Sequence, residues 1–180
     1  MSNQVDEYEL TKGQKLAGNI ISGVYTLACG VFLLLVGLSV IPSLTIENTA
    51  LSAILITIGL VFFTTSLIQV NTVSLWLSFC FFTPAAVTIL VNATELGYNN
   101  LYPLYIAIPA IASLFTMIMS KARKDHLKTI FFFGVFAGIF ALQSSGLVGW
   151  EVVIPAIIVF VGLLITVLAI KSKREDADNE

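Results

Sequence analysis

Residues 17–41, AGNIISGVYTLACGVFLLLVGLSVI, form an uncharged stretch longer than the roughly 20 residues with which a helix crosses a bilayer. Its apolar residues occupy every side of a helix, whereas a membrane β-strand alternates apolar and polar positions over about ten residues. The stretch also exceeds the apolar core of about 7–15 residues in a cleaved signal peptide, and the tail before it is acidic. It therefore predicts an uncleaved membrane-spanning helix.

Five further apolar stretches follow along the chain. They cover residues 50–68, 75–91, 102–119, a region from 129 that weakens through 143–146, and 152–170. Paired in chain order, the six spans form three hairpins, 17–68, 75–119 and 129–170, between tails of residues 1–16 and 171–180. The sequence therefore predicts an all-α, polytopic membrane protein with six transmembrane helices in a single membrane domain.

The composition excludes other fold classes. Of the 180 residues, 57% are hydrophobic and 11% are charged, and the mean hydropathy is +0.95. Soluble domains are about 45–50% apolar and about 25% charged. The tails are also far shorter than the ~40 residues that an independent fold usually needs. A soluble catalytic domain and a nucleic-acid partner are therefore excluded, and the expected surroundings are the lipid bilayer.

The basic residues indicate the orientation of the spans, because Lys and Arg are retained in cytoplasmic loops and depleted from translocated ones. In a six-span chain all nine fall on one side: Lys12, Lys15, Lys121, Arg123, Lys124, Lys128, Lys171, Lys173 and Arg174. We therefore expect both termini and the 121–128 loop to be cytoplasmic, in an integral protein of a prokaryotic inner or plasma membrane.

The loops on the opposite side hold acidic residues and no basic ones: Glu47, Glu95 and Glu151. A glutamate in water loses its charge over roughly pH 5 to 3.5. Loss of mutual repulsion would let these short loops approach one another. The three residues are therefore candidates for an acid-responsive outer surface, with a merely tolerated loop glutamate as the alternative.

The hairpins also have the pattern of an internal repeat. The second and third share Ile-Pro-Ala-Ile, at 108–111 and 154–157, in the returning helix. All three hairpins would enter the membrane from the same side, unlike the inverted repeats of many alternating-access transporters. We therefore expect parallel repeats. The alternative is a chance similarity between apolar segments built from few residue types.

Small residues mark candidate helix-packing faces. Gly23, Gly30 and Gly37 recur every seven residues in the first span, and Gly134 and Gly138 lie four apart in the fifth. Without a side chain, helix backbones can approach closely in lipid. We expect these glycines to face another helix of the monomer, or alternatively a second copy in a homo-oligomer.

Two prolines mark a candidate cavity. Pro84 and Pro109 lie inside the third and fourth spans, where proline removes a backbone donor and bends a helix. The second hairpin is therefore the expected position of kinks that free carbonyl groups for a ligand. Helix packing explains the prolines equally well.

Catalytic and metal-binding patterns are missing from the sequence. No ionisable residue lies at mid-membrane depth, which disfavours proton-coupled transport. Cys29 and Cys80 are far from a Cys-x-x-Cys spacing, and His126 has no partner at ligand spacing. We therefore expect no enzymatic activity and no cofactor.

Gly23, Gly30, Gly37, Pro42 and Gly59 follow a pattern of glycines on an outgoing helix and a break before the return. In this the chain resembles the HdeD-type acid-resistance membrane proteins, which also have about 180 residues and three hairpins. The third hairpin, from 133–134 through 149–150 to 154–156 and Gly162, is similar to the membrane hairpins of LiaF-type envelope-stress proteins. Neither resemblance implies a catalytic motif.

Two classes of function follow from these observations. The first is a non-enzymatic structural or envelope/acid-stress membrane protein that acts through packing, lipid or a partner protein. The second is a small-solute transporter or the membrane substrate-binding subunit of an importer, which six spans and this size also suit. A polar cavity between spans would favour the second class.

Overall fold

The computed structural model describes residues 11–94, 97–120 and 123–177. Over these residues the chain forms seven α-helices and no β-strand. The helices are α1 (Lys12–Gly37), α2 (Ile46–Gln69), α3 (Thr72–Ala93), α4 (Tyr98–Ile106), α5 (Ile108–Met119), α6 (Arg123–Ser144) and α7 (Trp150–Ala177). The prediction of an all-helical chain is therefore confirmed.

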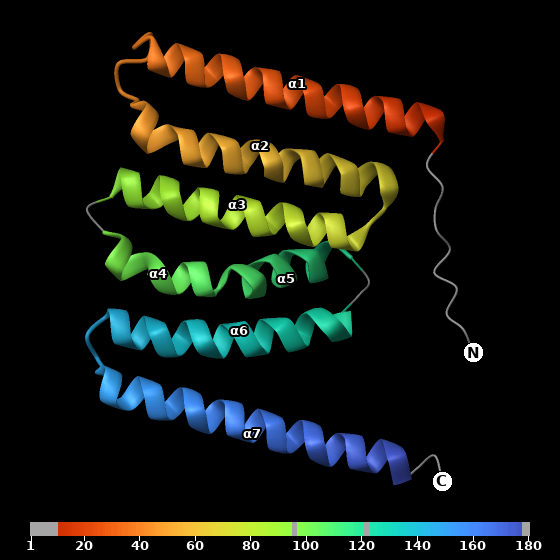
Figure 1. Cartoon of the computed structure of the whole chain (residues 1–180), viewed down its shortest axis with the longest axis vertical. Helices are drawn as coiled ribbons and strands as arrows, with labels where there is room; N and C mark the ends of the chain where they lie inside the picture. Colours follow the sequence, from red (N-terminus) through yellow and green to blue (C-terminus); the bar gives the residue numbers. More distant parts are fainter. Residues whose placement is uncertain (1–10, 95–96, 121–122, 178–180) are drawn as a thin grey trace.

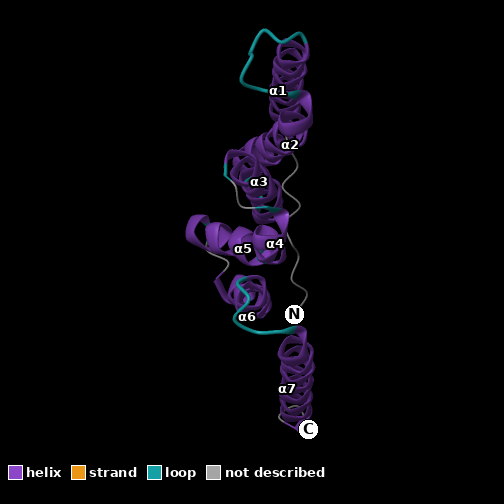
Figure 2. Ribbon diagram, turned by 90° about the vertical axis from the view of Figure 1, so that its left-hand side faces the viewer, coloured by secondary structure: helices purple, strands orange, loops and turns teal. Residues whose placement is uncertain are grey.

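The helices lie side by side in a single row (Figure 1). α1 contacts α2, α2 contacts α3, and α3 contacts both α4 and α5; these two contact α6, which contacts α7. No helix of the described chain contacts one further along than these. The view turned by 90° shows the same row edge-on (Figure 2). The fold is thus an open layer with α1 and α7 at its edges, and not a closed bundle.

Successive passes along the row run antiparallel, so the connections alternate between its two ends (Figure 1). Lys12 and Lys15 at the start of α1 and Lys128 near the start of α6 belong to one end. Glu47 and Glu151, in the first turns of α2 and α7, belong to the other. The described basic and acidic side chains are therefore separated along the helix axes.

The length and composition of the helices suit a membrane. α1, α2, α3 and the part of α6 from His126 to Ser144 are long and apolar enough to cross one. The pair α4 and α5 passes the same test as one bent span, and the apolar part of α7 runs from Trp150 to Thr166. Four to five helices of the described chain therefore have the properties of transmembrane helices.

The bend between α4 and α5 lies at Pro109, one of the two prolines at which the sequence predicts a kink. α4 and α5 meet at 49° around Ala107, and Pro109 occupies the first turn of α5. Proline offers no N–H to the carbonyl four residues earlier, and its ring clashes with that carbonyl, so the helix breaks there. α3 continues through Pro84 as a single helix.

Small side chains form the buried interfaces between α2, α3 and α5. Ser52, Gly59 and Ser66 are buried seven residues apart on α2. A β-carbon on Gly59 would lie 2.6 Å from two ring carbons of Phe82 on α3. Such close approach lets dispersion forces act between helices in lipid, where apolar surface alone gives no drive to associate. The small residues of α2 therefore set the spacing between α2 and α3.

Most of the glycines that the sequence predicts to pack against other helices do not line these interfaces. Gly23, Gly30, Gly134 and Gly138 are exposed, and a β-carbon on any of them would meet nothing within 4 Å. Only Gly37 approaches a neighbouring helix, where its β-carbon would lie 3.6 Å from Ile46 Cδ1. The expectation that the other four glycines pack inside the monomer is therefore wrong.

On α1 the prediction failed because another face of the helix meets α2. Ser22, Cys29 and Val36 are half-buried or buried, and each directly precedes one of the three glycines. Adjacent helical residues differ by about 100° around the axis, so Gly23 and Gly30 are turned away from α2. Spacing alone identified a shared face, but not the face that is covered.

Candidate functional site

Several hydroxyl groups lie near the start of α3, where α2 and α5 finish and α6 begins. Most of them are occupied by their own helix, as is usual for Ser and Thr in apolar surroundings. Ser78 Oγ donates to Leu75 O at 2.6 Å, and Thr116 Oγ1 donates to Ala112 O at 2.7 Å. These bonds satisfy the hydroxyl donors without a ligand.

One polar contact crosses between helices here. Trp76 Nε1 on α3 donates to Ser113 Oγ on α5 at 2.9 Å, and Ser113 is fully buried. A buried indole N–H needs such an acceptor. The bond therefore fixes α5 beside the first turns of α3.

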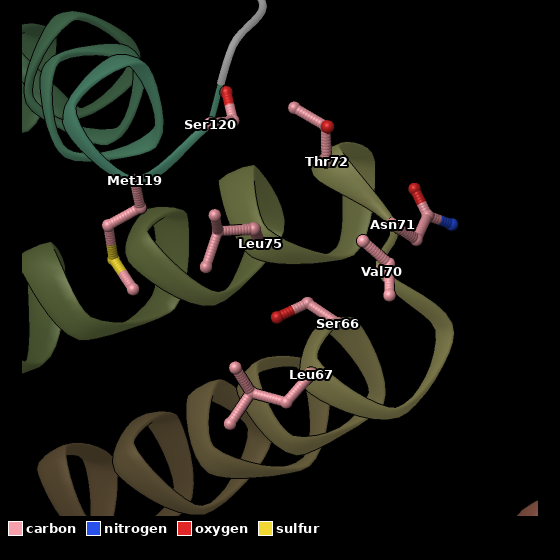
Figure 3. A pocket seen from close by; sticks show the side chains of 8 residues that line it. All are labelled: Ser66, Leu67, Val70, Asn71, Thr72, Leu75, Met119 and Ser120. Atoms are coloured by element: carbon pink, nitrogen blue, oxygen red, sulfur yellow. The ribbon is translucent and has the colours of Figure 1, made fainter.

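A pocket of about 500 Å³, which we call the Ser120 pocket, lies at the start of α3 (Figure 3). Its lining comes from the end of α2, the turn before α3, the first turns of α3 and the end of α5. The polar lining residues are Ser66, Asn71, Thr72 and Ser120, and the apolar ones are Leu67, Val70, Leu75 and Met119. The pocket therefore combines polar groups at the end of the row with an apolar wall that continues along it.

The local sequence explains the shape of this corner. Val70 adopts the left-handed conformation at φ 51° and ends α2, which few β-branched residues do. Asn71 then caps α3, because its Oδ1 accepts a 2.9 Å hydrogen bond from the Val73 N–H. Two residues thus reverse the chain and leave the N-terminus of α3 beside the pocket.

Ser120 is the exceptional group of the lining. Its Oγ is shielded from solvent and has no hydrogen-bond partner among the described residues. A buried hydroxyl without a partner costs about 1–3 kcal/mol. Ser120 therefore leaves one unpartnered polar atom at this corner of the fold.

A smaller hollow of about 260 Å³ lies on the other flank of α3. It shares Thr72 with the Ser120 pocket and is lined also by Trp76, Ser113, His126 and Thr129. The start of α3 is therefore bordered by a hollow on each side. His126, for which the sequence shows no partner at metal-ligand spacing, is half-buried and lies within α6.

A third hollow, of about 540 Å³, lies between α3 and the bent pair of α4 and α5. Leu104 and Ile111, on either side of the bend, face it, together with Thr83 next to Pro84 in the chain. Neither predicted proline lines it, although Pro109 makes the bend beside it. Its walls are apolar, with Thr83 as the polar exception.

The acidic residues do not meet in a site. Glu47 and Glu151 are exposed, each in the first turn of its helix, and Glu95 lies outside the described residues. The Glu151 carboxylate folds over Gly149, where any β-carbon would collide with it. Carboxylates are favourable at helix N-termini because of the helix dipole, so this placement is explained by helix stability.

Metal-binding and redox sites are not formed by the described residues. No group of three or more His, Cys, Asp or Glu side chains gathers among them. Cys29 on α1 and Cys80 on α3 are free thiols on helices that do not touch.

Sequence reasoning missed the Ser120 pocket. Its residues are separated along the chain, and only packing of α5 against α3 brings Ser120 near Thr72. The one available signal was the polar turn 69–74, in which Asn71 precedes an apolar stretch as a helix cap does.

Comparison with known proteins gives no assignment. No protein-family model matches the chain, and no significant match was found among curated proteins or among solved structures.

Proposed function

We propose that the chain is a six-span integral membrane protein that acts without catalysis, through its contacts with lipid and with partner proteins. The observation that carries this proposal is the open row of helices. Enzymes and carriers enclose a reacting or moving molecule, which requires helices that surround it. A row in which each span, with α4 and α5 counted as one, contacts only the spans next to it instead exposes apolar side chains on both faces.

The edge helices α1 and α7 expose apolar side chains in this way. On α1 the exposed side chains include Val24, Leu27 and Leu34, and on α7 they include Ile158 and Leu163. Lipid covers such surfaces without penalty, and a partner helix or a second copy covers them equally well. The proposed partners are therefore the bilayer and membrane proteins, including a homo-oligomer.

The proposed topology places both termini and the α5–α6 connection in the cytoplasm. The alternating connections, with Lys12 and Lys128 at one end and Glu47 and Glu151 at the other, support three parallel hairpins under the positive-inside rule. The sixth span is α7, whose described apolar part is extended by the apolar residues 167–170 of the sequence.

A role in envelope or acid stress in a prokaryotic inner or plasma membrane is part of the proposal. It is supported by the resemblance to HdeD-type proteins and by the acidic end of the row.

Cysteine accessibility tests this proposal. In a background with Cys29 and Cys80 replaced by alanine, single cysteines are introduced at Glu47, Glu151 and Lys124. An impermeant maleimide added to intact cells should label the first two and spare Lys124→Cys until the membrane is opened. Labelling of Lys124→Cys in intact cells, or protection of both glutamate positions, would contradict the topology.

The second candidate function is that of a small-solute transporter or importer subunit. The Ser120 pocket favours it, because a polar cavity between spans is what such a protein needs. Saturable uptake or binding of a soluble metabolite by the reconstituted protein would select this function over the first.

A further inference from the structure

We infer that a notch between α1 and α2 binds the headgroup of phosphatidylethanolamine, a glycerophospholipid that carries both a phosphate and a primary ammonium group. The inference rests on the proposed function, because it requires lipid around the row, and it names the lipid that one edge of the row recognises. The α1–α2 notch has a volume of about 250 Å³. Its polar lining residues are Gln14, Lys15, Asn19, Ser22, Thr65 and Gln69.

The notch lies at one end of the row, where α1 begins and α2 ends (Figure 1). Lys15 belongs to the first turn of α1, and Gln69 is the last residue of α2. Gly18 also lines the notch, and a β-carbon there would lie 3.9 Å from Ile68 Cδ1. The missing side chain at Gly18 therefore leaves space between the two helices. Since the first predicted span begins at residue 17, Lys15 is expected at headgroup level.

The fold leaves most polar groups of the notch unused. Gln14 Oε1 accepts the Thr11 N–H at 2.9 Å, which leaves the amide Nε2 of Gln14 as a donor. The side chains of Asn19, Ser22 and Gln69 have no hydrogen-bond partner among the residues that the structure describes. In lipid, a polar group without a partner costs free energy. A ligand with hydrogen-bonding groups would offset this cost.

The charges of the notch suit a headgroup that carries both signs. On the α1 side, the Lys15 ammonium group provides a cation for a phosphate. On the α2 side, the last helical turn ends at Gln69, and its carbonyl groups form the negative end of the helix dipole, which favours a cation. Phosphatidylglycerol lacks this cation. Phosphatidylcholine has one, but its trimethylammonium group has no N–H to donate.

The size and surroundings of the notch favour a lipid headgroup over a partner helix or a soluble ligand. One turn of a helix, 10–12 Å wide and 5.4 Å long, occupies roughly 400–600 Å³. The notch, at about 250 Å³, is too small for it. Leu16, Ile20 and Leu67, each next to a lining residue in the chain, are more than half exposed. The acyl chains of a bound lipid cover such side chains, whereas a soluble phosphate ester leaves them bare.

Native mass spectrometry of the full chain tests the inference. The protein is purified in a maltoside detergent, which carries neither phosphate nor ammonium. It is then titrated separately with phosphatidylethanolamine, phosphatidylcholine and phosphatidylglycerol that have the same acyl chains. We expect one molecule of phosphatidylethanolamine to bind about tenfold more tightly than either other lipid, the gain expected from a hydrogen bond to a charged group. Lys15→Met should remove most of this binding, and Lys15→Arg should retain it.

Two matched controls separate the notch from the general surface. Lys12→Met removes a cation from the same turn of α1 outside the notch, and should keep the preference. Gly18→Leu fills the notch and should abolish the preference, whereas Gly23→Leu, with open space around its β-carbon, should keep it. Circular dichroism of each variant distinguishes a loss of helix from a loss of the site. Lys15 is exposed, so Lys15→Met tests the site even if Gly18→Leu does not fold.

Equal binding of the three lipids, or a preference unchanged in Lys15→Met and Gly18→Leu, would overturn the inference. Displacement of the lipid by an equal concentration of soluble phosphoethanolamine would also overturn it, by identifying a soluble ligand. A preference seen only after Asp6, Glu7 and Glu9 are replaced by their amides would overturn it too, because the acidic segment before α1 would then be the occupant of the notch.

The cysteine labelling experiment is independent of this readout. Unexpected labelling beside a retained preference for phosphatidylethanolamine would reject the proposed orientation and leave the lipid site standing. Loss of the preference beside the expected labelling would reject the lipid site alone.

Discussion

Replacing Gly59 by alanine places a methyl group in a helix contact that has no room for it. The new β-carbon would lie 2.6 Å from Cδ1 and Cε1 of Phe82 and 3.2 Å from its Cγ. The Phe82 ring also packs against Phe63 and Phe79, with ring centroids 6.3 Å and 6.1 Å away. Relief therefore requires the ring to move or the two helices to separate.

The expected effect follows from two opposing contributions. Overpacking costs about 1–3 kcal/mol, whereas alanine improves helix propensity over glycine by up to about 1 kcal/mol. Gly30→Ala is the matched control, because its β-carbon would meet nothing within 4 Å. The propensity contribution is common to both, so Gly59→Ala should be less stable than Gly30→Ala by about 1–3 kcal/mol.

Reversible unfolding in mixed micelles, followed by circular dichroism, measures this difference. A further variant, Phe82→Leu, should partly restore stability to Gly59→Ala although it destabilises the parent. This coupling would identify the ring as the source of the clash. Equal stability of Gly59→Ala and Gly30→Ala would refute the close approach of α2 and α3.

Three further predictions concern single features. Val70→Asn should raise the free energy of unfolding by about 1 kcal/mol in the same assay, because asparagine tolerates the left-handed conformation that strains valine; a destabilised variant would contradict the turn. Pro109→Ala should straighten the α4–α5 bend of 49°, seen as a longer distance between spin labels at the ends of the pair, whereas an unchanged distance would assign the bend to packing. Replacing Glu47, Glu95 and Glu151 together by glutamine should abolish any protection of cells during acid challenge at matched expression, because the variant has no carboxylate at these positions; full protection would show that the carboxylates play no part in it.

The positions of the helices could be predicted from the sequence, because the hydropathy and length of each apolar stretch indicate a helix directly. Each predicted span coincides with a helix or, for 102–119, with the pair α4 and α5. The bend at Pro109 also follows from local chemistry, because a proline inside a helix loses a hydrogen bond wherever it lies. Pro84 shows the limit, since its helix continues unbroken.

The contacts between helices could not be predicted in the same way. Gly23 and Gly30 share a face by their spacing, yet that face points away from α2. Gly59 is also a glycine, but it lies on the face of α2 that holds the small buried residues Ser52 and Ser66 and approaches Phe82 of α3 closely. Which face is covered depends on the neighbouring helix, and periodicity within one helix does not contain that information.

The candidate pocket was missed for a related reason. Ser120 and Thr72 are far apart in the sequence, and they meet only because α5 returns beside α3. Ser120 also looks ordinary in the sequence, since its unpartnered hydroxyl is a property of the folded corner.

The central claim is that the helices form an open row, and the separation of its two edges tests it most directly. Spin labels are attached at Gly30→Cys on α1 and Gly162→Cys on α7, in the background without Cys29 and Cys80. Both positions have open space beside them, and dilution with unlabelled protein removes distances between copies. Five helix-to-helix steps of about 8–10 Å place the labels roughly 40–50 Å apart in double electron–electron resonance. A dominant distance near the roughly 10 Å of neighbouring helices would show that α1 closes onto α7 as a bundle, and would contradict the open row.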